Sequence, residues 1–140
     1  MDPPRVDLLG SRSDSNGTEL RVRVASSRRA DVITIHADRP IETTTIAVDG
    51  LPPVTASPSY PNAAGERTWP YELRFYDPPP NGFTVTLRLR GSAPQLYVSD
   101  YTVGLEQLPG LAPRPPALDR SPYHTSDIVV VGRTFRPRVP

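Results

Sequence analysis

Hydrophobic residues occupy every second position along several short segments of this chain. The alternation is clearest in residues 19–25 and 83–90, where leucine, valine and phenylalanine alternate with arginine and threonine. A period of two residues places one set of side chains on each face of an extended strand, as in a half-buried β-strand. The same reasoning, together with β-branched and aromatic content, predicts further strands in residues 31–37, 43–48, 71–76, 95–102 and 126–135.

Turns containing glycine and proline separate these segments, for example at Asp49-Gly50 and in residues 77–82. No apolar repeat of 3.6 residues persists for three turns, so little or no helix is expected. Short strands at intervals of roughly ten residues are typical of antiparallel sandwiches. We therefore predict an all-β, antiparallel β-sandwich of the immunoglobulin or fibronectin kind, with about seven or eight strands.

The same patterns divide the chain into regions. Residues 1–18 are polar and rich in turn signals, and we expect a flexible N-terminal segment there. Residues 19–136 form one predicted β-sandwich domain, with long proline-rich loops at 51–70 and 103–127, and residues 137–140 form a tail.

Composition excludes several classes of protein. The chain of 140 residues has no cysteine, so it has neither disulfides nor thiolate metal sites, and its net charge of +1 does not favour nucleic acid as a partner. No apolar run reaches the roughly 20 residues of a membrane helix, and the N-terminus lacks the apolar region of a signal peptide. The chain is therefore expected either to be cytoplasmic or to be a part of a longer protein.

Two groups of residues have the side-chain types of a metal site or a catalytic triad. His36 and Asp38 have the spacing of two zinc ligands, but a third ligand is needed and the other histidine, His124, is distant in sequence. A strand-end histidine followed by a turn aspartate is the simpler interpretation, so we predict no metal site. Ser126 and Asp127 lie beside His124, yet adjacent residues point in different directions and cannot form a triad. They are expected to anchor the loop instead, and no catalytic residue is predicted.

Two sets of side chains could bind a partner. Four arginines on outward strand positions could form a basic stripe for anionic lipid or an acidic polymer, although a solvated sheet face is the simpler interpretation: Arg21, Arg23, Arg88 and Arg90. Five aromatic residues could build a sugar-binding platform, unless they fill the core: Trp69, Tyr71, Tyr76, Tyr97 and Tyr101. The predicted binding surface consists of the four arginines together with Tyr97 and Tyr101.

The order of the strand and turn segments also resembles a known family. The chain is similar to the soluble domain that follows the transmembrane helices in bacterial membrane-bound zinc peptidases of metallopeptidase family 28, the aminopeptidase and transferrin-receptor-like group. The matching segments are Leu20–Val24, Leu73–Pro80, Val85–Leu89, Leu108–Gly110, Arg114–Pro116 and Ser126–Phe135. The zinc site of the family also needs a Glu-Glu pair after its His-x-Asp, and none follows His36-Ala-Asp38, so no catalytic residue is carried over.

The resemblance implies a non-catalytic, extracytoplasmic accessory domain of a multi-pass membrane metallopeptidase. The domain would pack on or orient the peptidase domain of the same polypeptide, or contact substrate, while zinc would belong to the peptidase domain. The alternative is an independent module that binds envelope polysaccharide or a protein partner, and an exposed aromatic row on one sheet face would favour it. A small hydrolase using His36 and Asp38 is the third hypothesis.

Overall fold

The computed structural model describes residues 1–56, 69–104, 108–110 and 128–138. All regular structure in these residues is β, which confirms the predicted all-β class, and none of it is a helix that could span a membrane. The described residues form nine strands: β1 (Arg5–Asp14), β2 (Gly17–Ala25), β3 (Val32–Ala37), β4 (Thr43–Ala47), β5 (Val54–Ala56), β6 (Tyr71–Tyr76), β7 (Phe83–Leu89), β8 (Leu96–Val103) and β9 (Ile128–Phe135).

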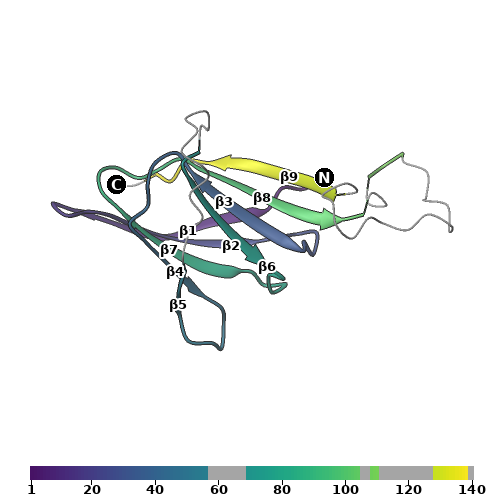
Figure 1. Ribbon diagram of the computed structural model, residues 1–140, viewed down its shortest axis with the longest axis horizontal. Coiled ribbons are helices and arrows are strands. Elements are labelled where there is room, and N and C mark those ends of the chain that lie inside the picture. Colours follow the sequence, from purple (N-terminus) through teal and green to yellow (C-terminus); the bar gives the residue numbers. More distant parts are fainter. Residues whose placement is uncertain (57–68, 105–107, 111–127, 139–140) are drawn as a thin grey trace.

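The strands form two antiparallel sheets packed face to face (Figure 1). Sheet A has the order β1-β2-β7-β4-β5, and sheet B has the order β6-β3-β8-β9. Every strand pair is antiparallel. The arrangement is the predicted antiparallel β-sandwich, with nine strands in the described residues where about seven or eight were expected.

The core lies between the two sheets and is built from the alternating positions that the sequence pattern identified. Val22 of β2 and Leu87 of β7 point inward from sheet A, and Ile33 and Val98 point inward from sheet B; all four are fully buried. Phe75 of β6 stacks on a core phenylalanine of β7, with ring centroids 4.1 Å apart. Burial of each such side chain stabilises the fold by roughly 1.5–3 kcal/mol, so the two sheets are held together mainly by apolar packing.

The N-terminal segment is not outside the domain, and this part of the domain prediction is wrong. Residues 5–14 form strand β1, which pairs along its whole length with β2. The sequence hides this strand because β1 is an edge strand with mostly exposed side chains, and because the register shifts between Leu8 and Gly10. The irregularity breaks the alternation that identifies other strands. A tight turn follows β1, since Asp14 pairs with Gly17.

The two proline-rich loops are described only in part. Strand β5 is a short edge strand within the first loop, while residues 57–68 lie outside the described residues. Most of the second loop, residues 111–127, also lies outside them, and this includes His124, Ser126 and Asp127.

Sheet A extends beyond sheet B at one side. Strand β4 lies opposite β6, because the hydroxyl oxygens of Thr44 and Tyr71 are 2.6 Å apart in the buried space between the sheets. Strand β5 follows β4 in sheet A, whereas β6 is the last strand of sheet B. Figure 1 shows the β4–β5 hairpin projecting past β6.

Candidate binding face

The outward-facing side of sheet B, called here the sheet B face, combines aromatic, apolar and charged side chains. The registers of β6, β3, β8 and β9 place these side chains in rows that cross all four strands. The rows are Glu72–His36–Tyr97–Thr134, Arg74–Thr34–Ser99–Gly132 and Tyr76–Val32–Tyr101–Val130.

A hydrogen-bonded trio lies at the β6 side of this face. Glu72 accepts from the His36 ring, with Nε2 and Oε2 3.0 Å apart, and from Nε of Arg74 at 2.5 Å. Burial alone raises the pKa of Glu72, but the hydrogen bonds from Arg74 and His36 and the charge of Arg74 outweigh it and leave the pKa below its ordinary value. Glu72 is therefore held as a carboxylate, although it is mostly buried.

The carboxylate selects the tautomer of His36. Because Glu72 can only accept, Nε2 of His36 carries the proton that it donates. In the neutral ring Nδ1 is then an acceptor, and among the described residues this buried atom has no hydrogen-bond partner. The buried hydroxyl of Thr34 also lacks a partner within the described part of the chain. These two polar atoms lie two residues apart on β3.

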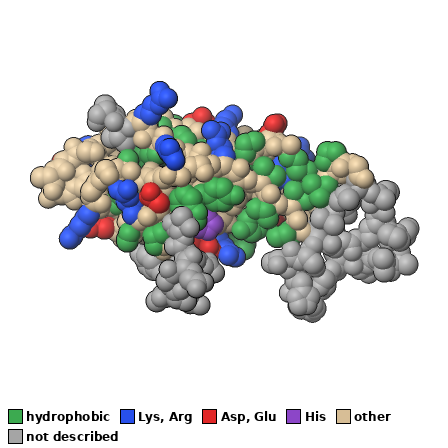
Figure 2. Space-filling view, turned by 90° about the horizontal axis from the view of Figure 1, so that it is seen from above, with side chains coloured by type: hydrophobic (Ala, Val, Ile, Leu, Met, Phe, Trp, Pro, Cys, Tyr) green, Lys and Arg blue, Asp and Glu red, His purple; other side chains and the backbone are tan. Residues whose placement is uncertain are grey.

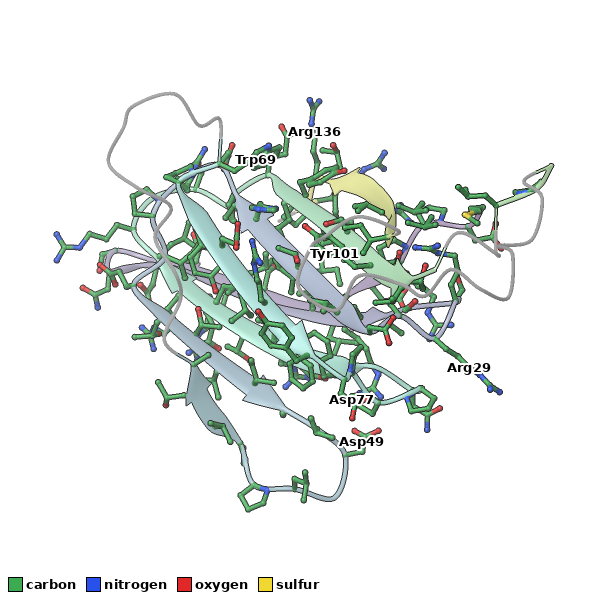
Figure 3. The ribbon with its side chains drawn as sticks, turned by 45° about the vertical axis from the view of Figure 1, so that its right-hand side comes forward. Arg29, Asp49, Trp69, Asp77, Tyr101 and Arg136 are labelled. Atoms are coloured by element: carbon green, nitrogen blue, oxygen red, sulfur yellow. The ribbon has the colours of Figure 1, made fainter. Side chains whose placement is uncertain are left out.

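An aromatic cluster continues from His36 across β8. The Tyr97 ring lies 6.1 Å from the His36 ring and 5.9 Å from the Trp69 ring, measured between centroids. Gly132 of β9 makes room for Tyr97, because a Cβ atom at Gly132 would lie 2.3 Å from the tyrosine hydroxyl. Figure 3 shows Trp69 at the upper end of sheet B and Tyr101 nearer its centre. The cluster is half-buried, so its ring edges contribute to the surface.

The other end of the sheet B face is apolar. Tyr76, Val103 and Val130 are 67%, 46% and 47% exposed. With three half-buried neighbours they form a set called here the apolar patch: Val32, Tyr76, Tyr101, Val103, Ile128 and Val130. Figure 2, seen from the β9 side, shows hydrophobic side chains gathered in the middle and on the right of the view. Outward positions of a solvated sandwich are normally polar, so this concentration indicates an interaction surface.

The two candidate metal ligands do not act together. His36 is engaged by Glu72, whereas the Asp38 carboxylate accepts from the backbone N–H of Gln95 at 3.0 Å and from Arg39 at 3.3 Å. Within the described residues, no group of three or more histidine, aspartate or glutamate side chains is placed to hold a metal ion. The role of Asp38 is thus to fix the start of β8.

The four arginines of the predicted stripe do lie on the outer face of sheet A, but acidic neighbours neutralise three of them. Arg23 pairs with Asp49 at 3.0 Å and Arg90 with Glu42 at 2.7 Å. Arg88 lies 3.6 Å from Glu19, which also binds Arg12. Arg21 alone of the four has no ion pair with a described residue. The stripe is a mixed-charge surface, and it does not favour an anionic partner.

The aromatic platform is present in part. Trp69, Tyr76, Tyr97 and Tyr101 lie on the sheet B face, whereas Tyr71 points into the core and is fully buried, which is the core-filling role weighed against the platform. Tyr71 follows the opposite parity along β6 from Tyr76, and that difference was readable from the sequence.

Sequence reasoning missed the aliphatic members of the apolar patch and the role of Glu72 and Arg74. These residues come from four strands, and only the register brings them into one surface. The signal available in the sequence was the alternation of Tyr97, Ser99 and Tyr101 with the core residues of β8. Ser126 and Asp127, the predicted loop anchors, lie outside the described residues.

No protein-family model matches the chain, and comparisons with curated proteins and with solved structures find no similar protein.

Proposed function

We propose that this domain is a binding module that recognises a protein partner through the sheet B face. The observation that carries the proposal is the apolar patch, which spans outward positions of all four strands of sheet B. Large aromatic side chains beside exposed valines are the composition typical of the centre of a protein interface. Burial of this patch against a partner would remove the exposed apolar surface from water.

The composition of the sheet B face favours a protein partner over an acidic polymer or a polysaccharide. An acidic polymer needs unpaired basic groups, and the arginines of sheet A are largely paired with acidic neighbours. A polysaccharide needs aromatic faces combined with polar groups that can hydrogen-bond sugar hydroxyls, and the apolar patch offers valine and isoleucine instead. Polysaccharide binding through Trp69 and Tyr97 is the outcome that the test below distinguishes.

The resemblance to the peptidase-associated domain stays a prediction, as do the extracytoplasmic location and the zinc of the parent enzyme. If it holds, the partner of the sheet B face is the peptidase domain of the same polypeptide. The domain itself would then position the enzyme without taking part in catalysis.

The experiment compares retention of proteins from the source organism by three forms of the immobilised domain. Val130→Asp places a charge within the apolar patch, on its β9 side, and Arg21→Asp changes the charge on the opposite sheet as the matched control. The proposal expects a protein retained by the wild type and by Arg21→Asp, with a loss of at least about tenfold for Val130→Asp. Circular dichroism of each variant shows whether the fold is retained.

Two results would overturn the proposal. One is equal retention of the same proteins by all three forms. The other is a shift of the domain in gels containing a soluble polysaccharide that Val130→Asp leaves unchanged and Trp69→Ala abolishes, which would assign the face to carbohydrate.

A further inference from the structure

An apolar hollow lies where sheet A extends beyond sheet B. Its volume is about 440 Å³, and its lining belongs to β4, β5, the turn between them and β6: Ile46, Val48, Leu51, Pro52, Val54 and Phe75. The register places Ile46 and Val54 on the inner side of sheet A, the side that faces sheet B. Leu51 and Val54 are 65% and 63% exposed, because no described strand of sheet B covers them.

The open edge of β6 borders this hollow. Among the described residues β6 pairs only with β3. The hydrogen bonds from Asp77 N–H to Asp31 C=O and from Asp38 N–H to Gln95 C=O show that odd-numbered residues of β3 bond to β6 and even-numbered ones to β8. On β6 the partners of the odd residues are Tyr71, Leu73 and Phe75.

The alternate residues of β6 therefore direct their main-chain groups away from the sheet. These are Glu72, Arg74 and Tyr76, whose N–H and C=O groups face the space above the β4–β5 hairpin. Within the part of the chain that the structure describes, these main-chain groups have no pairing strand, and the apolar hollow lies beside them. The β6 edge therefore offers two kinds of contact at once. An extended strand satisfies both, with its backbone on β6 and alternate side chains in the hollow.

We propose that this groove, formed by the β6 edge and the apolar hollow, binds an extended segment of a partner protein as a fifth strand of sheet B. The segment carries apolar residues at alternate positions, which enter the hollow, and polar residues between them. This site adjoins the sheet B face, because both include β6, but it does not depend on the function proposed above. The binding mode is strand addition, in which main-chain hydrogen bonds supply affinity and the side-chain hollow supplies selectivity.

Because strand β5 of sheet A extends beyond β6, the added strand must have no further layer of its own protein on the side that faces sheet A. A second copy of this domain would bring its own β4, which lies beneath its β6, into the space that β5 occupies. Neighbouring strands are about 4.8 Å apart, so the two hairpins would overlap. A fatty acyl chain could fill the hollow, but it would leave the main-chain groups of Glu72, Arg74 and Tyr76 unpaired.

Charge at one end of the groove indicates the direction of the segment. Asp77 follows β6 directly and is exposed, whereas the carboxylate of Asp49 at the same end is already paired with Arg23. Figure 3 shows Asp49 and Asp77 at this lower end. An antiparallel strand would begin beside Asp77, so a positive N-terminal residue is favoured there.

The probe is a seven-residue peptide that begins with lysine and then alternates valine with threonine. The readout is amide hydrogen exchange of the domain, residue by residue. In the free domain the amides of Glu72, Arg74 and Tyr76 should exchange fast, while those of Leu73 and Phe75 are protected. At saturating peptide the three fast amides should slow by at least about tenfold.

Matched changes in peptide and protein complete the test. A peptide of the same composition with its valines consecutive should bind at least about tenfold more weakly, because only the alternating order matches the hollow. Val54→Asp should abolish protection, whereas Val130→Asp on the sheet B face should leave it unchanged. A failure of the protein-partner proposal for that face would therefore not affect this result.

Four results would overturn the proposal. The first is slow exchange of the Glu72, Arg74 and Tyr76 amides already in the free domain. The second is equal binding of the two peptides, and the third is peptide-induced protection of these amides that survives Val54→Asp. The fourth is the absence of any change with peptide while decanoate shifts the side-chain signals of Ile46 and Val54, which would identify an acyl-chain site.

Discussion

The guanidinium group of Arg28 lies against the carboxylate of Asp100 between the ends of the two sheets, with side chains 9% and 0% exposed. Arg28 also bonds Thr102, and the second carboxylate oxygen of Asp100 accepts from the Ser26 hydroxyl at 2.5 Å. The Ser26 oxygen in turn accepts backbone N–H groups of Arg28 and Ala30. This network fixes the turn between β2 and β3 to strand β8.

Removal of one member of the buried pair should destabilise the domain strongly. Asp100→Ala leaves the Arg28 charge buried without its partner, and we expect the free energy of unfolding to fall by about 3–5 kcal/mol. Chemical denaturation of the variant measures this loss. Asp7→Ala is the control, because Asp7 and Arg5 form an exposed ion pair whose removal should change stability by less than about 1 kcal/mol. Similar losses for the two variants would contradict the role given to the network.

The same substitution at two buried threonines should have opposite effects. The buried hydroxyl of Thr34 has no partner among the described residues, whereas the Thr44 hydroxyl bonds Tyr71 at 2.6 Å. Thr34→Val should therefore stabilise the domain by about 1 kcal/mol, and Thr44→Val should destabilise it by about 1–3 kcal/mol. Thermal and denaturant unfolding of both variants test the signs. Destabilisation by Thr34→Val would show that its hydroxyl has a partner in solution.

Two turn glycines allow the stability cost of backbone strain to be measured apart from the cost of steric overlap. Gly82 and Gly91 have φ values of +79° and +85°, so alanine at either position costs roughly 1–2 kcal/mol of strain. A Cβ atom at Gly82 would also lie 2.1 Å from the Val24 carbonyl oxygen, whereas nothing lies within 4 Å at Gly91. Gly82→Ala should consequently lose at least about 1 kcal/mol more stability than Gly91→Ala in parallel denaturation. Equal losses would mean that strand β2 moves aside without cost.

The trio around Glu72 should contribute stability that depends on pH. The pKa of Glu72 is lower in the folded domain than its ordinary value of 4.5, so the unfolded chain binds the proton more tightly. The contribution is complete above the unfolded pKa and is lost as the pH falls through the folded pKa. Glu72→Gln should therefore be less stable than wild type at pH 7, with a difference that shrinks under acid conditions. Unfolding free energies measured between pH 7 and pH 3 test this, and a constant difference would contradict it.

Local pattern was sufficient to predict most of the sandwich. The segments 19–25 and 83–90 became the adjacent strands β2 and β7, since each buries a complete face and every inward position is apolar. Strand β1 escaped prediction because its stability comes from pairing with β2 and its own apolar positions are few.

The candidate surfaces depended on register, which local pattern does not contain. The ion pairs of Arg88 and Arg90 with Glu19 and Glu42 join residues that are far apart in sequence. In the same way, Val130 joins Tyr101 only because β9 pairs with β8 in one particular alignment. Composition shows that such residues exist, and only the assembled sheets decide which of them share a surface.

The strand order has a consequence for the synthesis of this protein. Strand β7 lies between β2 and β4 in sheet A, and β3 lies between β6 and β8 in sheet B. Each half of the sandwich thus has a central strand whose partners include one made much later or much earlier on the ribosome. Neither sheet can be completed before β7 and β8 have left the ribosome. The apolar faces of the earlier strands therefore stay uncovered until then. Folding should accordingly be late and concerted, at the slow rates of topologies dominated by distant contacts.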